Sequence, residues 1–142
     1  MEITELIKLR DFVCAELQTD SKLKQPQIII DALIQIPIRD GVLRFLYDNP
    51  ESRTRAAVNL GKLLSKCVEH EKAALATIKA GCHWLDEDVE KTKEALNTAL
   101  TADSTYSLAR LLDVALVHGV PPKVWADSLA AVSPEQCFSG AA

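Results

Sequence analysis

Aromatic residues make up only 5% of this 142-residue chain, although 48% of its residues are hydrophobic. A core with so few rings must be filled mainly by Leu, Ile, Val and Ala, which is typical of helix-on-helix packing. Charged residues account for 25%, as in ordinary globular proteins. A chain of this length can bury a core without disulfide or metal cross-links. We therefore predict an all-α fold, with a single helical domain over residues 1–133 and a frayed tail over 134–142.

Long apolar segments are also missing from the chain. No stretch approaches the roughly 20 apolar residues that cross a bilayer. The N-terminal segment MEITELIKLRDF is acidic and amphipathic, unlike the basic and then apolar start of a signal peptide. The net charge of −4 disfavours bulk binding to nucleic acid. These absences predict a cytoplasmic protein that does not insert into a membrane.

Motifs for catalysis and cofactor binding are absent as well. The five glycines are too scattered to form a phosphate-binding loop, and there is neither a dinucleotide fingerprint nor a nucleophile elbow. The wide spacing of the cysteines favours reduced thiols over disulfides. The four cysteines are Cys14, Cys67, Cys82 and Cys137. We therefore expect neither an enzyme nor a resident cofactor.

Two cysteine–histidine pairs come nearest to a chemical site, because thiolate and imidazole can bind zinc or act as nucleophile and base. Adjacent helical residues such as Cys82 and His83 point about 100° apart, whereas Cys67 and His70 share a helix face. A four-ligand cluster would form if the two helices met as a hairpin, but no CxxC or HExxH spacing supports it. We interpret these residues as core thiols and surface imidazoles, with a metal site as the alternative.

Hydrophobic residues recur at helical spacing along most of the chain. The predicted helices cover residues 2–18, 27–36, 38–47, 50–67, 73–85, 89–100 and 108–116, followed by a short helix from Pro121 and Pro122 through Leu129. Short connections place sequential helices antiparallel, so we predict an irregular array of seven to eight helices. Gly119 is expected to cap the seventh helix, and Trp84 to anchor the fifth helix against the sixth.

The run from Gln27 to Ile36 also suits a strand, because its three consecutive isoleucines favour extended structure. Periodicity alone does not separate a short apolar helix from a buried strand. We favour a largely buried helix, since Gln27, Asp31 and Gln35 form a polar stripe at four-residue spacing. Pro37 is expected to end this helix or to turn the chain sharply into the next one.

An ordered set of short motifs runs from Ala73 to Trp125. They are Ala73-Ala74-Leu75, Trp84, Ala95-Leu96, Ala99-Leu100, Asp103, Tyr106-Ser107-Leu108-Ala109, Leu111-Leu112, Gly119 and Pro121-Pro122. In these motifs the chain resembles the helical C-terminal half of an actinobacterial and actinobacteriophage family, a domain of unknown function. With Arg39-Asp40 included, the resemblance covers roughly the last 60% of the chain. It implies a helical fold and an actinobacterial or phage origin, but no catalytic residue.

The chain departs from this family pattern at two turns. Leu85-Asp86-Glu87 replaces a glycine–aspartate turn, and Ser104 replaces a proline. Residues 73–109 are also weakly similar to a tetratricopeptide repeat, with a tryptophan, a turn and small residues at four-residue spacing. Only one such unit is visible, whereas a solenoid needs about three. A non-repeat bundle is therefore preferred.

Charges of opposite sign separate along the chain. Residues 86–103 carry six acidic and two basic residues, whereas residues 38–66 carry six basic and three acidic ones. The basic residues are Arg39, Arg44, Arg53, Arg55, Lys62 and Lys66. The last four are expected to be mostly available to solvent on an amphipathic helix. The two segments can pair within the fold, in a homodimer or with a partner, and the alternative is a pair of solvated faces.

These features favour a non-enzymatic protein–protein interaction module, of phage origin and acting on a host protein. Its six basic residues would contact an acidic protein partner or the acidic segment of a second copy, because the planar guanidinium group of arginine suits interface contacts. The alternative is a nucleic-acid-associated helical protein that uses the basic residues 39–66.

Overall fold

The computed structural model describes residues 2–124 and Asp127, and this part of the chain is helical without any strand. Its elements are α1 (Ile3–Leu17), α2 (Pro26–Leu33), α3 (Ile36–Asp48), the 3-10 helix η1 (Pro50–Ser52), α4 (Arg53–Leu64), α5 (Glu69–Leu85), α6 (Val89–Ala102) and α7 (Ser107–Val117). The predicted all-α class is confirmed, as is the helical interpretation of the isoleucine-rich segment. Within the described residues, none of the helices is both long and apolar enough to cross a membrane.

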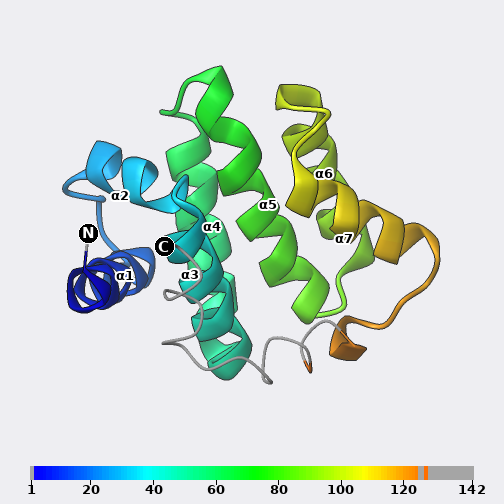
Figure 1. The fold of residues 1–142 in the computed structure, drawn as a ribbon, viewed down its shortest axis with the longest axis horizontal. Helices are drawn as coiled ribbons and strands as arrows, with labels where there is room; N and C mark the ends of the chain where they lie inside the picture. The colour runs from blue at the N-terminus through cyan, green and yellow to red at the C-terminus, as the bar shows by residue number, and fades with distance from the viewer. Residues whose placement is uncertain (1, 125–126, 128–142) are drawn as a thin grey trace.

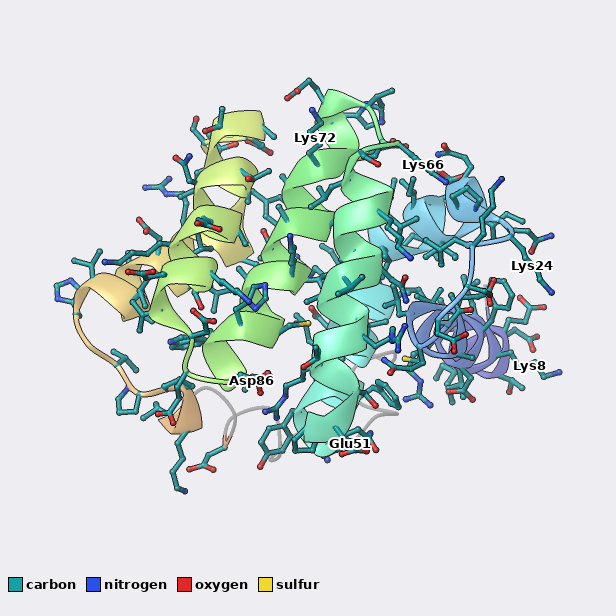
Figure 2. All side chains as sticks on the ribbon, turned by 180° about the vertical axis from the view of Figure 1, so that it is seen from behind. Lys8, Lys24, Glu51, Lys66, Lys72 and Asp86 are labelled. Carbon is teal, nitrogen blue, oxygen red and sulfur yellow. The ribbon has the colours of Figure 1, made fainter. Side chains whose placement is uncertain are left out.

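Helix α5 lies at the centre of the molecule, with α4 on one side and α6 on the other (Figure 1). These three helices run antiparallel. Seen from behind, Lys66 and Lys72 lie at one end of them, and Glu51 and Asp86 at the other (Figure 2). Helix α1 lies crosswise to them and is seen nearly end-on in Figure 1. The expected antiparallel packing of neighbours therefore holds for α4 to α6, whereas the N-terminal helices cross.

Two hydrophobic cores share α5, because different faces of this helix serve each of them. Leu75, Ile78 and Cys82 face a larger core that α1, α2, α3 and α4 complete. Ala76, Ala80 and Trp84, spaced four residues apart, face a smaller core completed by α6 and α7. Trp84 is almost fully buried there, packed in the same cluster as Leu96 on α6 and Leu112 on α7. The expected anchoring position of Trp84 between α5 and α6 is therefore confirmed.

The expected corner between the second and third helices is present, but it lies a few residues earlier than predicted. Helix α2 ends at Leu33, and Pro37 lies in the first turn of α3 instead of closing α2. A first-turn proline is well tolerated because its missing N–H would have no partner within the helix. The predicted burial of this segment is also only partly right, because Ile28, Ile34 and Ile36 are exposed.

Helix α7 ends in the predicted glycine cap. Gly119 has a φ of 68°, and its N–H donates to the carbonyl of Leu116 (3.2 Å), while the Val120 N–H donates to Ala115 (2.8 Å). This is the Schellman arrangement, in which a left-handed residue satisfies the last carbonyls of the helix. Residues 122–124 begin the final helix expected after Pro121. The remainder of that helix and the proposed tail over 134–142 lie outside the described residues.

The periodic face predicted for α7 is only partly buried. Leu112 is buried, but Leu111 is 66% exposed, and Val114 and Val117 are also exposed. The exposed residues repeat at three-residue spacing, so they form an apolar stripe along the outer side of the helix. The spacing of apolar residues correctly predicted a helix, but the small neighbouring core buries only one side of α7.

Candidate functional site

Arg53 was expected on the solvent-accessible basic face, and this expectation is wrong. Its side chain is buried, and its guanidinium group donates to the carbonyl oxygens of Leu46 (2.8 Å) and Tyr47 (3.2 Å), near the end of α3. The Nη1 atom also donates to a carboxylate oxygen of Asp86 at 2.9 Å. A cation at the C-terminal ends of helices satisfies carbonyls that lack an intrahelical partner. Arg53 therefore joins the end of α3 to the turn after α5.

Two further arginines of the predicted face also have partners within the fold. Arg39 pairs with the neighbouring Asp40 (2.9 Å), and its Nη1 atom donates to the hydroxyl of Tyr106 (3.1 Å). Arg44 pairs with Asp48 at 3.0 Å, one turn along α3. These side chains are largely covered and tie their helix to nearby groups. The six predicted basic residues therefore do not form one continuous free surface.

The remaining three basic residues lie together on the outer side of α4. Arg55, Lys62 and Lys66 are exposed, and none of their side chains makes an ion pair within the described part of the chain. Val58 lies between them and is 51% exposed. Because helical residues advance by about 100°, these four positions share one stripe along α4 and its end. We call Arg55, Val58, Lys62 and Lys66 the α4 stripe.

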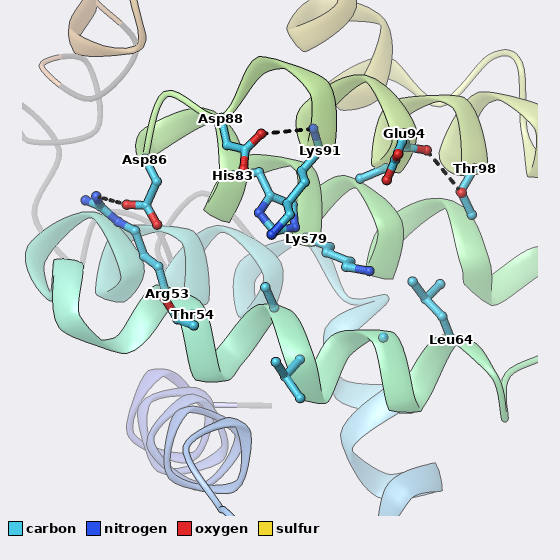
Figure 3. A pocket seen from close by; sticks show the side chains of 14 residues that line it. Arg53, Thr54, Leu64, Lys79, His83, Asp86, Asp88, Lys91, Glu94 and Thr98 are labelled. Atoms are coloured by element: carbon cyan, nitrogen blue, oxygen red, sulfur yellow. Dashed lines mark hydrogen bonds and ion pairs between the residues drawn. The ribbon is translucent and has the colours of Figure 1, made fainter.

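A groove of about 510 Å³ adjoins the α4 stripe at Val58. Residues of α4 and α6 form its walls, and Lys79 and His83 of α5 lie between them (Figure 3). The α4 wall is partly apolar, with Ala57, Val58 and Gly61. A volume of this size is within the usual range of small-molecule pockets. The groove is therefore the concave feature of the described structure that merits a functional interpretation.

Charged groups of both signs line this groove. Figure 3 shows the Arg53–Asp86 pair at one end and the side chains of Lys79, His83 and Lys91 along its length. Burial of the imidazole lowers the pKa of His83, and the positive charges of Lys79 and Lys91 lower it further. At neutral pH the imidazole is therefore uncharged, because its lowered pKa favours the neutral form.

The two cysteine–histidine pairs do not converge. Cys67 and His70 lie around the start of α5, whereas Cys82 and His83 lie near its end. Thirteen residues separate the two histidines, which corresponds to roughly 20 Å along a helix. Burial raises the pKa of the Cys82 thiol to about 12, so this sulfur stays protonated at neutral pH. Within the described residues, no group of three or more His, Cys, Asp or Glu side chains is placed to hold a metal ion.

A family model described as "Domain of unknown function (DUF4192)" matches residues 10–123. The chain belongs to this family. The matched region includes α2 to α7, the α4 stripe and every residue of the groove, and it begins well before the stretch that carried the resemblance in the sequence. Neither the curated proteins nor the solved structures gave a match to the chain. The DUF4192 domain is therefore the unit to which the groove and the stripe belong.

The sequence contained only a weak signal for the groove of this DUF4192 domain. Lys79 and His83 are four residues apart, so they share one face of α5. The neighbouring residues Ala76 and Ala80 are small and apolar, and such residues are typical of a helix that packs closely against its neighbours. Lys91 was noted only as a minority charge in an acidic segment. The convergence of these three residues depends on the antiparallel packing of α5 and α6, which local spacing does not specify.

Proposed function

We propose that this chain is a non-enzymatic protein-interaction module that binds an acidic helical segment of another protein along the α4 stripe. The observation that supports this proposal is a set of three exposed cations that make no ion pair with any described residue, Arg55, Lys62 and Lys66, grouped around the exposed Val58. An apolar residue within a charged rim is a common arrangement at interfaces. Three turns of a partner helix would cover the stripe, which follows one side of α4 and its end for about 16 Å.

Arg39, Arg44 and Arg53 have partners within the fold. Of the six basic residues, the other three are therefore the ones available to bind another molecule. This internal pairing also weakens the alternative of nucleic-acid binding, because fewer cations remain for phosphate contacts. An acidic protein segment can place its carboxylates on the three exposed cations of the stripe. We therefore favour a protein partner over nucleic acid.

The proposal includes the origin of this chain, the source of its partner and the compartment in which they meet. The resemblance of residues 73–125 to an actinobacterial and phage family supports an actinobacterial host protein as the partner of a phage product. Cys14, Cys67 and Cys82 are free thiols, which supports a cytoplasmic setting. An actinobacterial lysate is accordingly the source of partner for the test.

The test compares two double charge reversals with the same change in net charge. Lys62→Glu with Lys66→Glu alters the stripe, and Lys22→Glu with Lys24→Glu alters exposed lysines before α2. Immobilised parent and variants are incubated with lysate, with and without nuclease treatment, and bound proteins are identified by mass spectrometry. We expect the parent and the Lys22/Lys24 variant to retain the same acidic protein, and the Lys62/Lys66 variant to lose it.

The parent and both variants must also have the same thermal unfolding midpoint. Loss of the partner can then be attributed to the altered surface and not to unfolding. Retention should also weaken as salt is raised, because exposed charges are screened. Equal capture by both variants would rule out the α4 stripe as the binding surface. Loss of all retained material on nuclease treatment would instead assign this face to nucleic acid.

A further inference from the structure

Two lysines that line the groove are not part of the surface in the proposed function. Lys79 on α5 and Lys91 on α6 line the same groove, and neither side chain makes an ion pair within the described residues. Figure 3 shows both side chains beside His83 in the space that α4 and α6 flank. The two ammonium groups come from different helices and place positive charge in one concave surface, which His83 also lines.

Two of the acidic residues that line the groove have hydrogen-bond partners. The Asp86 carboxylate is held by Arg53 at 2.9 Å, and a carboxylate oxygen of Asp88 accepts the backbone N–H of Lys91 at 3.2 Å. The charges of Lys79 and Lys91 affect the pKa of His83 more strongly than those of Asp88 and Asp86 do. The direction of this shift is the electrostatic support for an anion site, although Glu94 also lines the groove.

The α4 wall gives these positive charges an apolar neighbour and open space. A Cβ atom added at Gly61 would lie 3.5 Å from Nζ of Lys79, so the ammonium group reaches across to α4 where a side chain is missing. Ala57 and Val58 extend the same wall. A ligand that combines an anionic head with a compact apolar part would match both features.

We propose that the groove binds a phosphate monoester, with the phosphate between Lys79 and Lys91 and the organic part against Ala57, Val58 and Gly61. A phosphate dianion offers three acceptor oxygens, enough for two ammonium groups and an N–H of the neutral His83 imidazole. The phosphate can belong to a free small molecule or to a phosphorylated side chain. This site is separate from the α4 stripe and does not depend on the proposed partner.

The three histidines of the chain provide a direct readout. Imidazole resonances of the full chain are followed by NMR while phenyl phosphate, inorganic phosphate or a short phosphoserine peptide is added. Bound dianion offsets the charges of Lys79 and Lys91, so the pKa of His83 should rise. His70 and His118 are exposed and lie outside the groove, so they serve as internal controls. We expect phenyl phosphate to bind more tightly than inorganic phosphate, because only the former contacts the apolar wall.

Comparison of the two organic probes identifies the source of the phosphate. Tighter binding of phenyl phosphate indicates a small molecule, whereas tighter binding of the phosphoserine peptide indicates a modified protein. Lys79→Gln and Lys91→Gln should each weaken binding about tenfold, since each removes a charge-assisted hydrogen bond. Lys93→Gln, an exposed position on α6 outside the groove, should change affinity less than twofold.

Gly61→Ala separates binding from folding. Replacing a glycine within a helix should raise the unfolding midpoint, while the new methyl group contacts the Lys79 ammonium and weakens phosphate binding several-fold. The Lys62/Lys66 double variant should keep its affinity for phenyl phosphate even if it loses its partner, so the two proposals can fail separately. The phosphate site is overturned if His83 shows no saturable shift, if all three histidines respond alike, or if Lys93→Gln weakens binding as much as Lys79→Gln.

Discussion

The two hydrophobic cores on either side of α5 differ in size and in the types of residue that fill them. In the described residues, the larger core has 21 buried residues, only four of them alanine, and five helices supply its side chains. The smaller core has eight buried residues, and five of them are alanine. Trp84 is the one aromatic residue among these eight, and the partly buried Tyr106 packs against them. Stability in the first core is shared among many aliphatic side chains, whereas the second relies on close helix packing around a single large ring.

This difference explains why α7 leaves an apolar stripe exposed. Alanines bring α5 and α6 close together and leave a narrow surface for a third helix. Only Ala109 and Leu112 of α7 are fully buried in it. Arg53 connects the two regions through polar contacts, because it holds the end of α3 and also Asp86 in the turn between α5 and α6. The smaller region should therefore open at lower free energy than the larger one.

The largest expected effect comes from removing the ring at the centre of the smaller core. Trp84→Ala should lower the free energy of unfolding by about 3–5 kcal/mol through lost burial and a cavity. Denaturant titration measures the total. Amide hydrogen exchange then tests the comparison, because protection should fall in α6 and α7 while α1 to α4 keep most of theirs.

Leu63→Ala is the control in the larger core, where Leu63 is fully buried. It should cost about 2–5 kcal/mol and reduce protection across α1 to α5 together. If Trp84→Ala instead lowers protection uniformly along the chain, the two cores unfold as one unit and the comparison fails.

The next effect in size concerns the polar link between the regions. Arg53→Met should cost about 2–3 kcal/mol, because the buried carbonyl of Leu46 and the partly buried carbonyl of Tyr47 lose a charged donor. Asp86→Asn should cost less than about 1 kcal/mol, since that carboxylate is exposed and water replaces its partner. Urea titration of both variants gives the ranking. Equal losses would show that the Arg53–Asp86 ion pair, and not the carbonyl contacts, provides the stability.

Arg53 also marks the limit of what the sequence could predict. Within the described residues, helical periodicity located the seven α-helices, the buried Trp84 and the glycine cap at Gly119, because these depend on spacing over a few residues. The side chain of Arg53 bonds to residues as far away as Asp86, so its burial depends on tertiary packing. The groove was missed for the same reason. Its basic groups come from α5 and α6, and their convergence requires the antiparallel arrangement.

A smaller, stabilising effect is expected at the turn that closes α5. Glu87 has a φ of 60°, and its N–H donates to Trp84 (2.9 Å) while the Asp88 N–H donates to His83 (2.9 Å). This is a Schellman turn with glutamate in the position that usually holds glycine. Glu87→Gly should raise the unfolding free energy by about 0.5 kcal/mol. Glycine removes the strain of the left-handed conformation, and this gain exceeds the loss that comes from the greater entropy of the unfolded chain.

Glu87→Ala is the matched control for this turn, because it removes the carboxylate but keeps a Cβ atom in the left-handed conformation. Thermal unfolding of both variants separates backbone strain from charge. A gain in both would assign the effect to the acidic cluster at residues 86–88, and the interpretation of the turn as strained would be wrong.

The smallest effect is expected on the exposed side of α7, where two adjacent leucines provide a matched pair. Leu112 is buried in the smaller core, so Leu112→Ala should cost about 2–5 kcal/mol. Leu111 is 66% exposed, so Leu111→Ala should change the unfolding free energy by no more than about 0.5 kcal/mol. Both substitutions remove the same atoms from the same helix, so their difference measures burial directly.

A cost for Leu111→Ala close to that for Leu112→Ala would mean that the exposed stripe on α7 is covered in solution. Sedimentation of the parent at several concentrations would then show whether a second copy covers it, because self-association would make the stability depend on concentration.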